Sequence, residues 1–176
     1  MNSYVIQPNE LELLQLCAWQ KRFHQRAIGK RHYQFKTGVD INLFGLLGEY
    51  AFAKFFNFCP DLAWAEKGDD SEFGATTWYD FKLNNGKTFE IKTTDKTSFV
   101  INCARGRKKL QPDYYVMCRA KVPNTNQELE PHPVEICGWT TLDFVKKNCP
   151  ILSPERSPYW QIHMNLLKPL TRKQYA

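Results

Sequence analysis

Residues 78–94, WYDFKLNNGKTFEIKTT, alternate between apolar and polar side chains on both sides of an Asn-Asn-Gly turn. This period of two predicts a β-hairpin, whose glycine can adopt the left-handed conformation that closes a three-residue loop. Such a loop places Phe81 opposite Phe89 and Asp80 opposite Glu90. A two-residue Asn-Gly turn would instead put the two carboxylates on opposite faces. We favour the three-residue loop because it pairs apolar side chains on the buried face.

The two opposed carboxylates need an explanation, because like charges directly across a sheet are destabilising. Lys92 projects from the same face as Glu90, two residues further along the strand. The three charges could form a solvated outer face on which lysines offset the acids. Alternatively, they form a site for a hard cation such as Mg²⁺, which is usually held by one or two carboxylates. In that case the lysine could assist an attacking water or stabilise charge developing on a phosphate.

Residues 41–58 form a segment that is apolar nearly all the way round a helix, and this pattern predicts a mostly buried helix. Gly45 and Gly48 are poor helix formers, so we expect them to allow the helix to approach a sheet closely. Glu49 in such a helix needs a partner, because an unpaired buried carboxylate is costly. The partner could be an ordinary basic side chain, or Glu49 could lie on a narrow exposed stripe. Packed against the hairpin acids, it is a third candidate metal ligand.

The rest of the chain predicts further α/β elements around this core. Residues 8–27 predict an amphipathic helix that opens with a capping box from Asn9 to Glu12. Strands are expected at TSFVINC, at DYYVMCRA, at VEICGW and in the alternating stretch from Trp160 to Leu166, with a short helix beginning near Thr140. There is no internal repeat and no composition shift that marks a domain boundary. The 176 residues are therefore expected to form one domain around a mixed sheet.

The order of these motifs resembles that of the PD-(D/E)xK nuclease superfamily, in particular its small members encoded by phages and prophages. A helix carrying Gly48-Glu49 precedes an aspartate on one strand and the sequence Glu-Ile-Lys on the next. The resemblance covers residues 40–170, which would be the catalytic core, after an N-terminal helix and basic linker at residues 1–39. One departure is Tyr79, which stands where the proline that gives the family its name would be.

The resemblance implies a restriction-endonuclease-like α/β domain, with a mixed sheet flanked by helices, and a Mg²⁺-dependent deoxyribonuclease in which Mn²⁺ can substitute. By resemblance, Asp80 and Glu90 would be metal ligands and Lys92 the catalytic lysine. Glu49 would be an accessory ligand or a water-orienting acid. Exonucleases, endonucleases and junction resolvases share this core, so the type of cleavage is open. RNA as a substrate and assembly as a homodimer are open as well.

Two basic segments are candidates for contacts with the phosphate backbone of DNA. One lies in the linker IGKRHYQFKTG, where basic and aromatic residues are interleaved, and the other is the run ARGRKK after the predicted TSFVINC strand. A solvated loop accounts for either segment equally well. The candidate residues are Lys30, Arg31, Arg105, Arg107, Lys108 and Lys109.

Composition bounds the remaining possibilities. The net charge of +6, from 24 basic and 18 acidic residues, suits a polyanionic partner. We expect no membrane span, because no run of about 18 apolar residues occurs. The start of the chain lacks the layout of a signal peptide, which predicts a cytoplasmic protein; the resemblance implies the cytoplasm of a bacterium or of a phage-infected host. The six dispersed cysteines predict reduced thiols, without an iron–sulfur cluster.

An alternative to the nuclease is a non-catalytic module that binds nucleic acid or another protein and retains the nuclease fold. The presence of all four site residues favours the enzyme, because a decayed site would be expected to have lost one of them. A purely structural protein, in which the acids pair with nearby lysines, is a third hypothesis. It predicts neither a response to metal nor retention of DNA.

Overall fold

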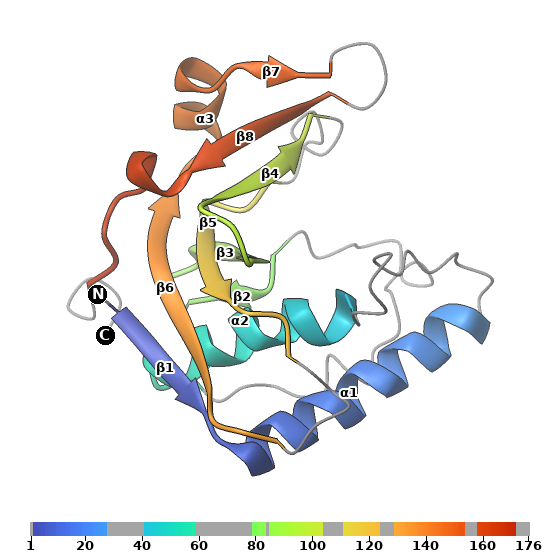
Figure 1. Ribbon diagram of the computed structural model, residues 1–176. Coiled ribbons are helices and arrows are strands. Elements are labelled where there is room, and N and C mark those ends of the chain that lie inside the picture. Colours follow the sequence, from blue (N-terminus) through green and yellow to red (C-terminus); the bar gives the residue numbers. More distant parts are fainter. Residues whose placement is uncertain are drawn as a thin grey trace.

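The computed structural model describes residues 2–27, 41–58, 79–83, 85–103, 111–123, 129–153 and 158–171, with the backbone alone for residues 21–27 and 41. Its elements in chain order are β1 (Asn2–Ile6), α1 (Pro8–Ala27), α2 (Ile41–Phe55), β2 (Phe81–Lys82), β3 (Thr88–Thr94), β4 (Ser98–Asn102), β5 (Tyr114–Ala120), β6 (His132–Thr140), α3 (Leu142–Asn148), β7 (Ile151–Leu152), β8 (Tyr159–His163) and a 3-10 turn at Met164–Leu166 (Figure 1).

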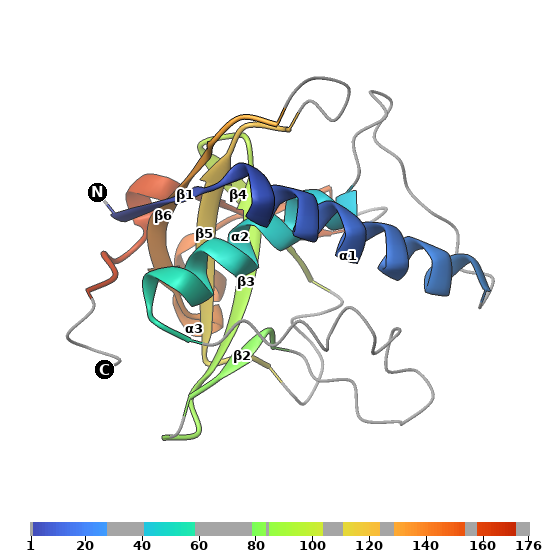
Figure 2. The same cartoon turned by 90° about the horizontal axis from the view of Figure 1, so that it is seen from below.

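The main sheet has five strands in the order β1-β6-β5-β3-β2. Strands β3 and β5 are parallel and every other pair is antiparallel, so the sheet is mixed, as predicted. Helix α2 packs across β1, β3, β5 and β6, and α1 packs on α2 (Figures 1 and 2). The first hydrophobic core lies between these helices and the sheet. The α/β class expected from the sequence is confirmed.

A second, three-stranded sheet in the order β4-β8-β7 lies with α3 beyond the main sheet (Figure 1). Strand β5 joins the two layers, because its alternate side chains enter different cores. Val116 and Cys118 belong to the core under the helices, whereas Tyr115 and Met117 pack with Trp160 in the second core. The sequence predicted strands at β4 and β8, although β8 ends at His163 rather than at Leu166, but it predicted neither β7 nor the separation of this sheet from the first.

The predicted hairpin register is confirmed. Phe81 pairs with Phe89, and the main-chain N–H of Leu83 donates to the carbonyl of Lys87 at 2.8 Å. Gly86 has a φ of +83°, the left-handed conformation expected at the end of a three-residue loop. Only two residues of the first arm form regular strand, however, so Asp80 lies just before β2.

Helix α2 is buried as predicted, although it ends at Phe55 rather than at residue 58. The close approach to the sheet occurs at Gly48. A Cβ atom added there would lie 2.1 Å from Thr93 Oγ1 and 3.0 Å from Cys118 Cβ. At Gly45 the nearest such contact is an ordinary 3.9 Å, so the prediction of close approach holds for Gly48 but not for Gly45.

The start of the chain differs from the sequence prediction in two ways. Strand β1, which was not predicted, pairs antiparallel with β6 at the edge of the main sheet. The bond by which a first-turn glutamate caps the helix start is made by Glu10 to Gln7 rather than by Glu12 to Asn9, since the Gln7 N–H donates to the Glu10 carboxylate at 2.9 Å. The strand β1 ends directly before Gln7, so the helix begins two residues earlier than its best sequence signal.

Within the described ranges, no helix is both long enough and apolar enough to cross a membrane. The described cysteines are all free thiols: Cys17, Cys103, Cys118, Cys137 and Cys149. Burial raises the pKa of the Cys137 thiol to about 11, and burial also raises the pKa of the fully enclosed Cys118 thiol. Thiols with raised pKa values are poor nucleophiles, so Cys118 and Cys137 contribute packing rather than chemistry.

Candidate active site

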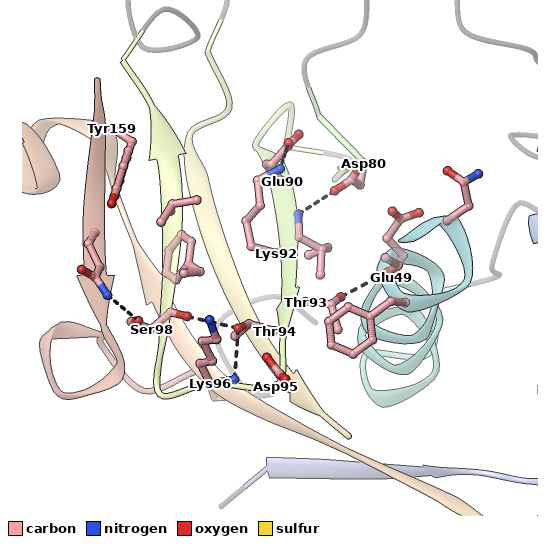
Figure 3. A pocket seen from close by; sticks show the side chains of 17 residues that line it. Glu49, Asp80, Glu90, Lys92, Thr93, Thr94, Asp95, Lys96, Ser98 and Tyr159 are labelled. Atoms are coloured by element: carbon pink, nitrogen blue, oxygen red, sulfur yellow. Dashed lines mark hydrogen bonds and ion pairs between the residues drawn. The ribbon is translucent and has the colours of Figure 1, made fainter. Parts of the chain in front are cut away.

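A pocket of about 720 Å³ lies between helix α2, the β2–β3 hairpin and the ribbon formed by β4 and β8 (Figure 3). All four residues predicted from the sequence line this pocket. Glu49 comes from α2, Asp80 from the segment before β2, and Glu90 and Lys92 from β3. Folding therefore brings together side chains that lie as far apart in the sequence as residues 49 and 92.

Asp80 is fixed to strand β3 by two hydrogen bonds. Its main-chain N–H donates to the carbonyl of Phe89 at 2.7 Å, and its Oδ2 accepts the main-chain N–H of Ile91 at 2.6 Å. The bond from the Ile91 N–H to the Asp80 carboxylate takes the place of the main-chain pairing that would otherwise continue along the first arm of the hairpin. Because both partners are main-chain groups of a central strand, the position of the Asp80 carboxylate is set by the register of the hairpin.

Glu90 and Lys92 project from the same face of β3, because side chains two residues apart in a strand share a face. Ile91 between them is buried on the opposite face against α2. The Lys92 ammonium and the Glu90 carboxylate form an ion pair, and their side chains are only 25% and 14% exposed. The ion pair holds the lysine beside the carboxylate at the wall of the pocket.

Glu49 reaches the pocket because α2 lies so close to β3 at Gly48. The Thr93 hydroxyl donates to the carbonyl of Gly45 at 3.2 Å, which ties the strand to the helix one turn before Glu49. Figure 3 shows the carboxylates of Glu49, Asp80 and Glu90 in a row, with Asp80 between the other two. The close packing of α2 against β3 at Gly48 therefore places Glu49, the third acid, in the pocket.

The electrostatics of Asp80 reflect this crowding. Desolvation by the surrounding protein raises the pKa of its carboxyl group well above the usual range, and the negative charges of Glu49 and Glu90 raise it further. The Lys92 charge and the Ile91 N–H act in the opposite direction but do not cancel the effect. By accessible area the residue is nevertheless exposed. Both observations describe a carboxylate on the wall of a hollow, open to a ligand yet surrounded by protein and like charge.

The pocket has an excess of acidic groups. Its charged lining residues are Glu49, Asp80, Glu90, Asp95, Lys92 and Lys96, which makes four carboxylates against two ammonium groups. An all-oxygen donor set of this kind suits a hard cation such as Mg²⁺. Among the described residues no three acidic, histidine or cysteine side chains are arranged closely enough to enclose a metal as they stand. The Glu90 carboxylate, for example, is turned toward Lys92.

The six basic residues predicted to contact DNA all lie outside the part of the chain that the structure describes. Conversely, the pocket contains residues that the sequence did not single out. Ser98, Val100, Tyr159 and Gln161, on strands β4 and β8, form its second wall. Their alternation with buried residues marked them as one face of two strands. No sequence signal placed that face opposite the acids.

Comparison of the chain with protein-family models, with curated proteins and with solved structures finds no match in any of the three.

Proposed function

We propose that the protein is a metal-dependent nuclease that hydrolyses phosphodiester bonds in DNA. The observation that carries the proposal is the convergence of Glu49, Asp80, Glu90 and Lys92 in one pocket. Burial and the charges of Glu49 and Glu90 raise the pKa of Asp80, which is unfavourable for folding unless a ligand uses these groups, and a strongly perturbed acid in a cleft marks a candidate functional site. A solvated outer face, the alternative for the hairpin, accounts less well for their position in a hollow.

In this proposal, Asp80 and Glu90 hold Mg²⁺, with Glu49 as a third carboxylate, and Mn²⁺ can take its place. The bound cation would lower the pKa of a coordinated water and neutralise charge on the scissile phosphate. Lys92 orients the attacking water or stabilises the negative charge that develops on the phosphate oxygens. Its ion pair with Glu90 keeps the ammonium group beside the carboxylates.

The charge of the pocket supports a role for a cation. With four carboxylates against two ammonium groups, the wall repels a phosphate diester unless positive charge is added. A divalent cation supplies that charge at the place where the phosphate must sit. The predicted backbone contacts of Lys30, Arg31 and the basic run after β4 would add affinity without sequence information.

The arrangement of elements is also compatible with a restriction-endonuclease-like domain, which we propose as the finer description of the fold. A buried helix with a Gly-Glu pair packs against the hairpin that carries the other site residues, and β5 runs parallel to β3 beyond it. Tyr79 in place of proline does not disturb this geometry, because Asp80 is fixed by hydrogen bonds to β3.

The test is cleavage of supercoiled, linear and single-stranded DNA in Mg²⁺ or Mn²⁺. Replacing Asp80, Glu90 or Lys92 with alanine should lower the rate about 10²-fold or more, the effect of removing a preorganised electrostatic group. Asp143→Ala, an exposed acid at the start of α3 and outside the pocket, is the matched control. Cutting by the Asp80→Ala protein at the wild-type rate would refute the assignment.

A non-catalytic module that binds nucleic acid or protein is the second candidate. The ion pair between Glu90 and Lys92 favours it, because the pair engages two of the proposed catalytic groups with each other. This candidate predicts that DNA is retained in a salt-sensitive manner but is not cut, and that Mg²⁺ leaves thermal stability unchanged. A nuclease predicts the opposite on both counts.

A further inference from the structure

The ribbon formed by β4 and β8 has two faces of different character. Phe99, Ile101, Trp160 and Ile162 point into the second core and are buried. Their neighbours Ser98, Val100, Tyr159 and Gln161, which we call the ribbon face, point the other way and line the pocket. The face is held firmly, since its reverse side is packed and its strands are paired along their length.

The ribbon face combines apolar area with hydrogen-bonding groups and carries no charge. Val100 is 52% exposed and lies directly opposite Gln161 in the strand pairing. Tyr159 is the next residue of β8 on the same face. The Gln161 amide donates to the Ser98 hydroxyl at 2.9 Å, so the amide oxygen can accept from a ligand and the hydroxyl proton can be donated to one.

The ribbon face and the acids are opposite walls of the same pocket. In Figure 3, Tyr159 and Ser98 lie on one side, Asp80 and Glu49 on the other, and Glu90 and Lys92 between them. A phosphate held at the acids would therefore place its neighbouring nucleotide against the ribbon face. An aromatic ring, an aliphatic side chain and an amide are the groups on which nucleic-acid bases stack and pair in single-strand sites.

The position of the ribbon face bears on the form of the DNA. The pocket volume of about 720 Å³ lies within the roughly 300–1,000 Å³ of pockets that enclose one small ligand. The phosphates of a duplex lie on its outside, but its bases are stacked and paired inside it. A base can therefore reach the ribbon face, beside a phosphate held at the acids, only when it is unpaired.

We infer that the ribbon face is a subsite for an unpaired nucleotide next to the scissile phosphate, and that the substrate is a single strand or an unpaired end of DNA. The inference rests on the proposed nuclease function and specifies its substrate. Tyr159 and Val100 support the base, and the Gln161–Ser98 pair meets its polar edge. The uncharged wall binds bases while the opposite wall, with its cation, binds the phosphate.

The experiment measures binding by fluorescence anisotropy of a labelled oligothymidylate of about 12 nucleotides, within the range of single-strand site sizes, and of its duplex with oligodeoxyadenylate. Ca²⁺, which takes the same oxygen ligands as Mg²⁺, is present to neutralise the acids. The wild type should bind the single strand more tightly than the duplex. Tyr159→Ala should weaken single-strand binding by about 5- to 150-fold, the range for loss of one stacked base. Tyr159→Phe should retain it.

A second variant guards against loss of folding in Tyr159→Ala. Val100→Glu changes an exposed side chain and places a negative charge on the ribbon face, so it should weaken single-strand binding with little effect on thermal unfolding. Val5→Glu, the same change at a 43% exposed valine of β1 on the far edge of the main sheet, is its control.

The inference is overturned if the wild type prefers the duplex or binds neither form, or if Val100→Glu and Val5→Glu bind the single strand equally. Cleavage by the same proteins separates this inference from the proposed function. If cleavage depends on Asp80 but not on Tyr159, the subsite on the ribbon face is refuted and the proposed nuclease function stands. Single-strand binding that depends on Tyr159, without cutting in Mg²⁺ or Mn²⁺, refutes the nuclease and leaves the subsite standing.

Discussion

The closeness of α2 to β3 yields a sharp test at Gly48. An alanine Cβ at Gly48 would lie 2.1 Å from Thr93 Oγ1, 3.0 Å from Cys118 Cβ and 3.3 Å from Ile91 Cγ2. Overpacking of this kind costs about 1–3 kcal/mol. Rotating Thr93 away would break its hydrogen bond to Gly45, for about 0.5–1.5 kcal/mol more. Alanine regains about 1 kcal/mol of helix propensity. We therefore expect Gly48→Ala to lower the free energy of unfolding by about 0.5–3.5 kcal/mol.

Gly45→Ala, one turn earlier in the same helix, is the matched control. Among the described residues, its Cβ would meet only Glu49 Oε1 at 3.9 Å, an ordinary contact. The helix propensity should then dominate, and the variant should be more stable than the wild type by about 0.5–1 kcal/mol. The two substitutions are chemically identical, so the opposite signs would come from packing alone.

Urea unfolding followed by circular dichroism measures both changes, provided that the slope against urea stays constant. If Gly48→Ala proved as stable as Gly45→Ala, α2 would not approach β3 as closely as described. The position of Glu49 beside Asp80 would then lose its structural basis, because that position depends on the same approach.

Three further predictions concern charge. Because the pKa of Asp80 is raised in the fold, its contribution to stability is present at acid pH and is lost as the pH rises through the folded pKa. In EDTA, Asp80→Asn should therefore be more stable than the wild type at pH 8. Denaturation at lower pH should show a smaller difference in stability between the two proteins. Added Mg²⁺ should stabilise the wild type by about 2.7 kcal/mol at a hundredfold excess over Kd, but not Asp80→Asn, and equal shifts in both proteins would refute a metal site there. Asp113 has a lowered pKa, chiefly through its hydrogen bond from Lys87 and despite partial burial. Asp113→Ala should lower the free energy of unfolding by about 1–2 kcal/mol at pH 7. When stability is measured as a function of pH, this difference should disappear below about pH 4, because the wild-type carboxylate is protonated there.

The hairpin and the buried helix could be predicted because their signals are local. The alternation around Gly86 defined which side chains face each other, and the structure has that register. The apolar pattern of α2 indicated a buried helix, and its glycines suggested close packing, which occurs at Gly48. Strand β1 and the shifted capping bond were missed, because the polar segment around Gln7 takes its structure from pairing with β6, far along the chain.

The second sheet could not be predicted, and it is what makes the pocket. Strands β3 and β4 are separated by only three residues, and consecutive strands commonly pair in one sheet. Here β3 stays in the main sheet, whereas β4 pairs with β8, which follows it by almost sixty residues. If β4 had paired within the main sheet, its exposed side chains would have lain on the same surface as Glu90 and Lys92. Because the chain changes sheet at residues 95–97, that face turns toward the acids and gives them an opposite wall. The acids alone suggest a metal and a phosphate, and the opposite wall indicates which part of the substrate lies beside them.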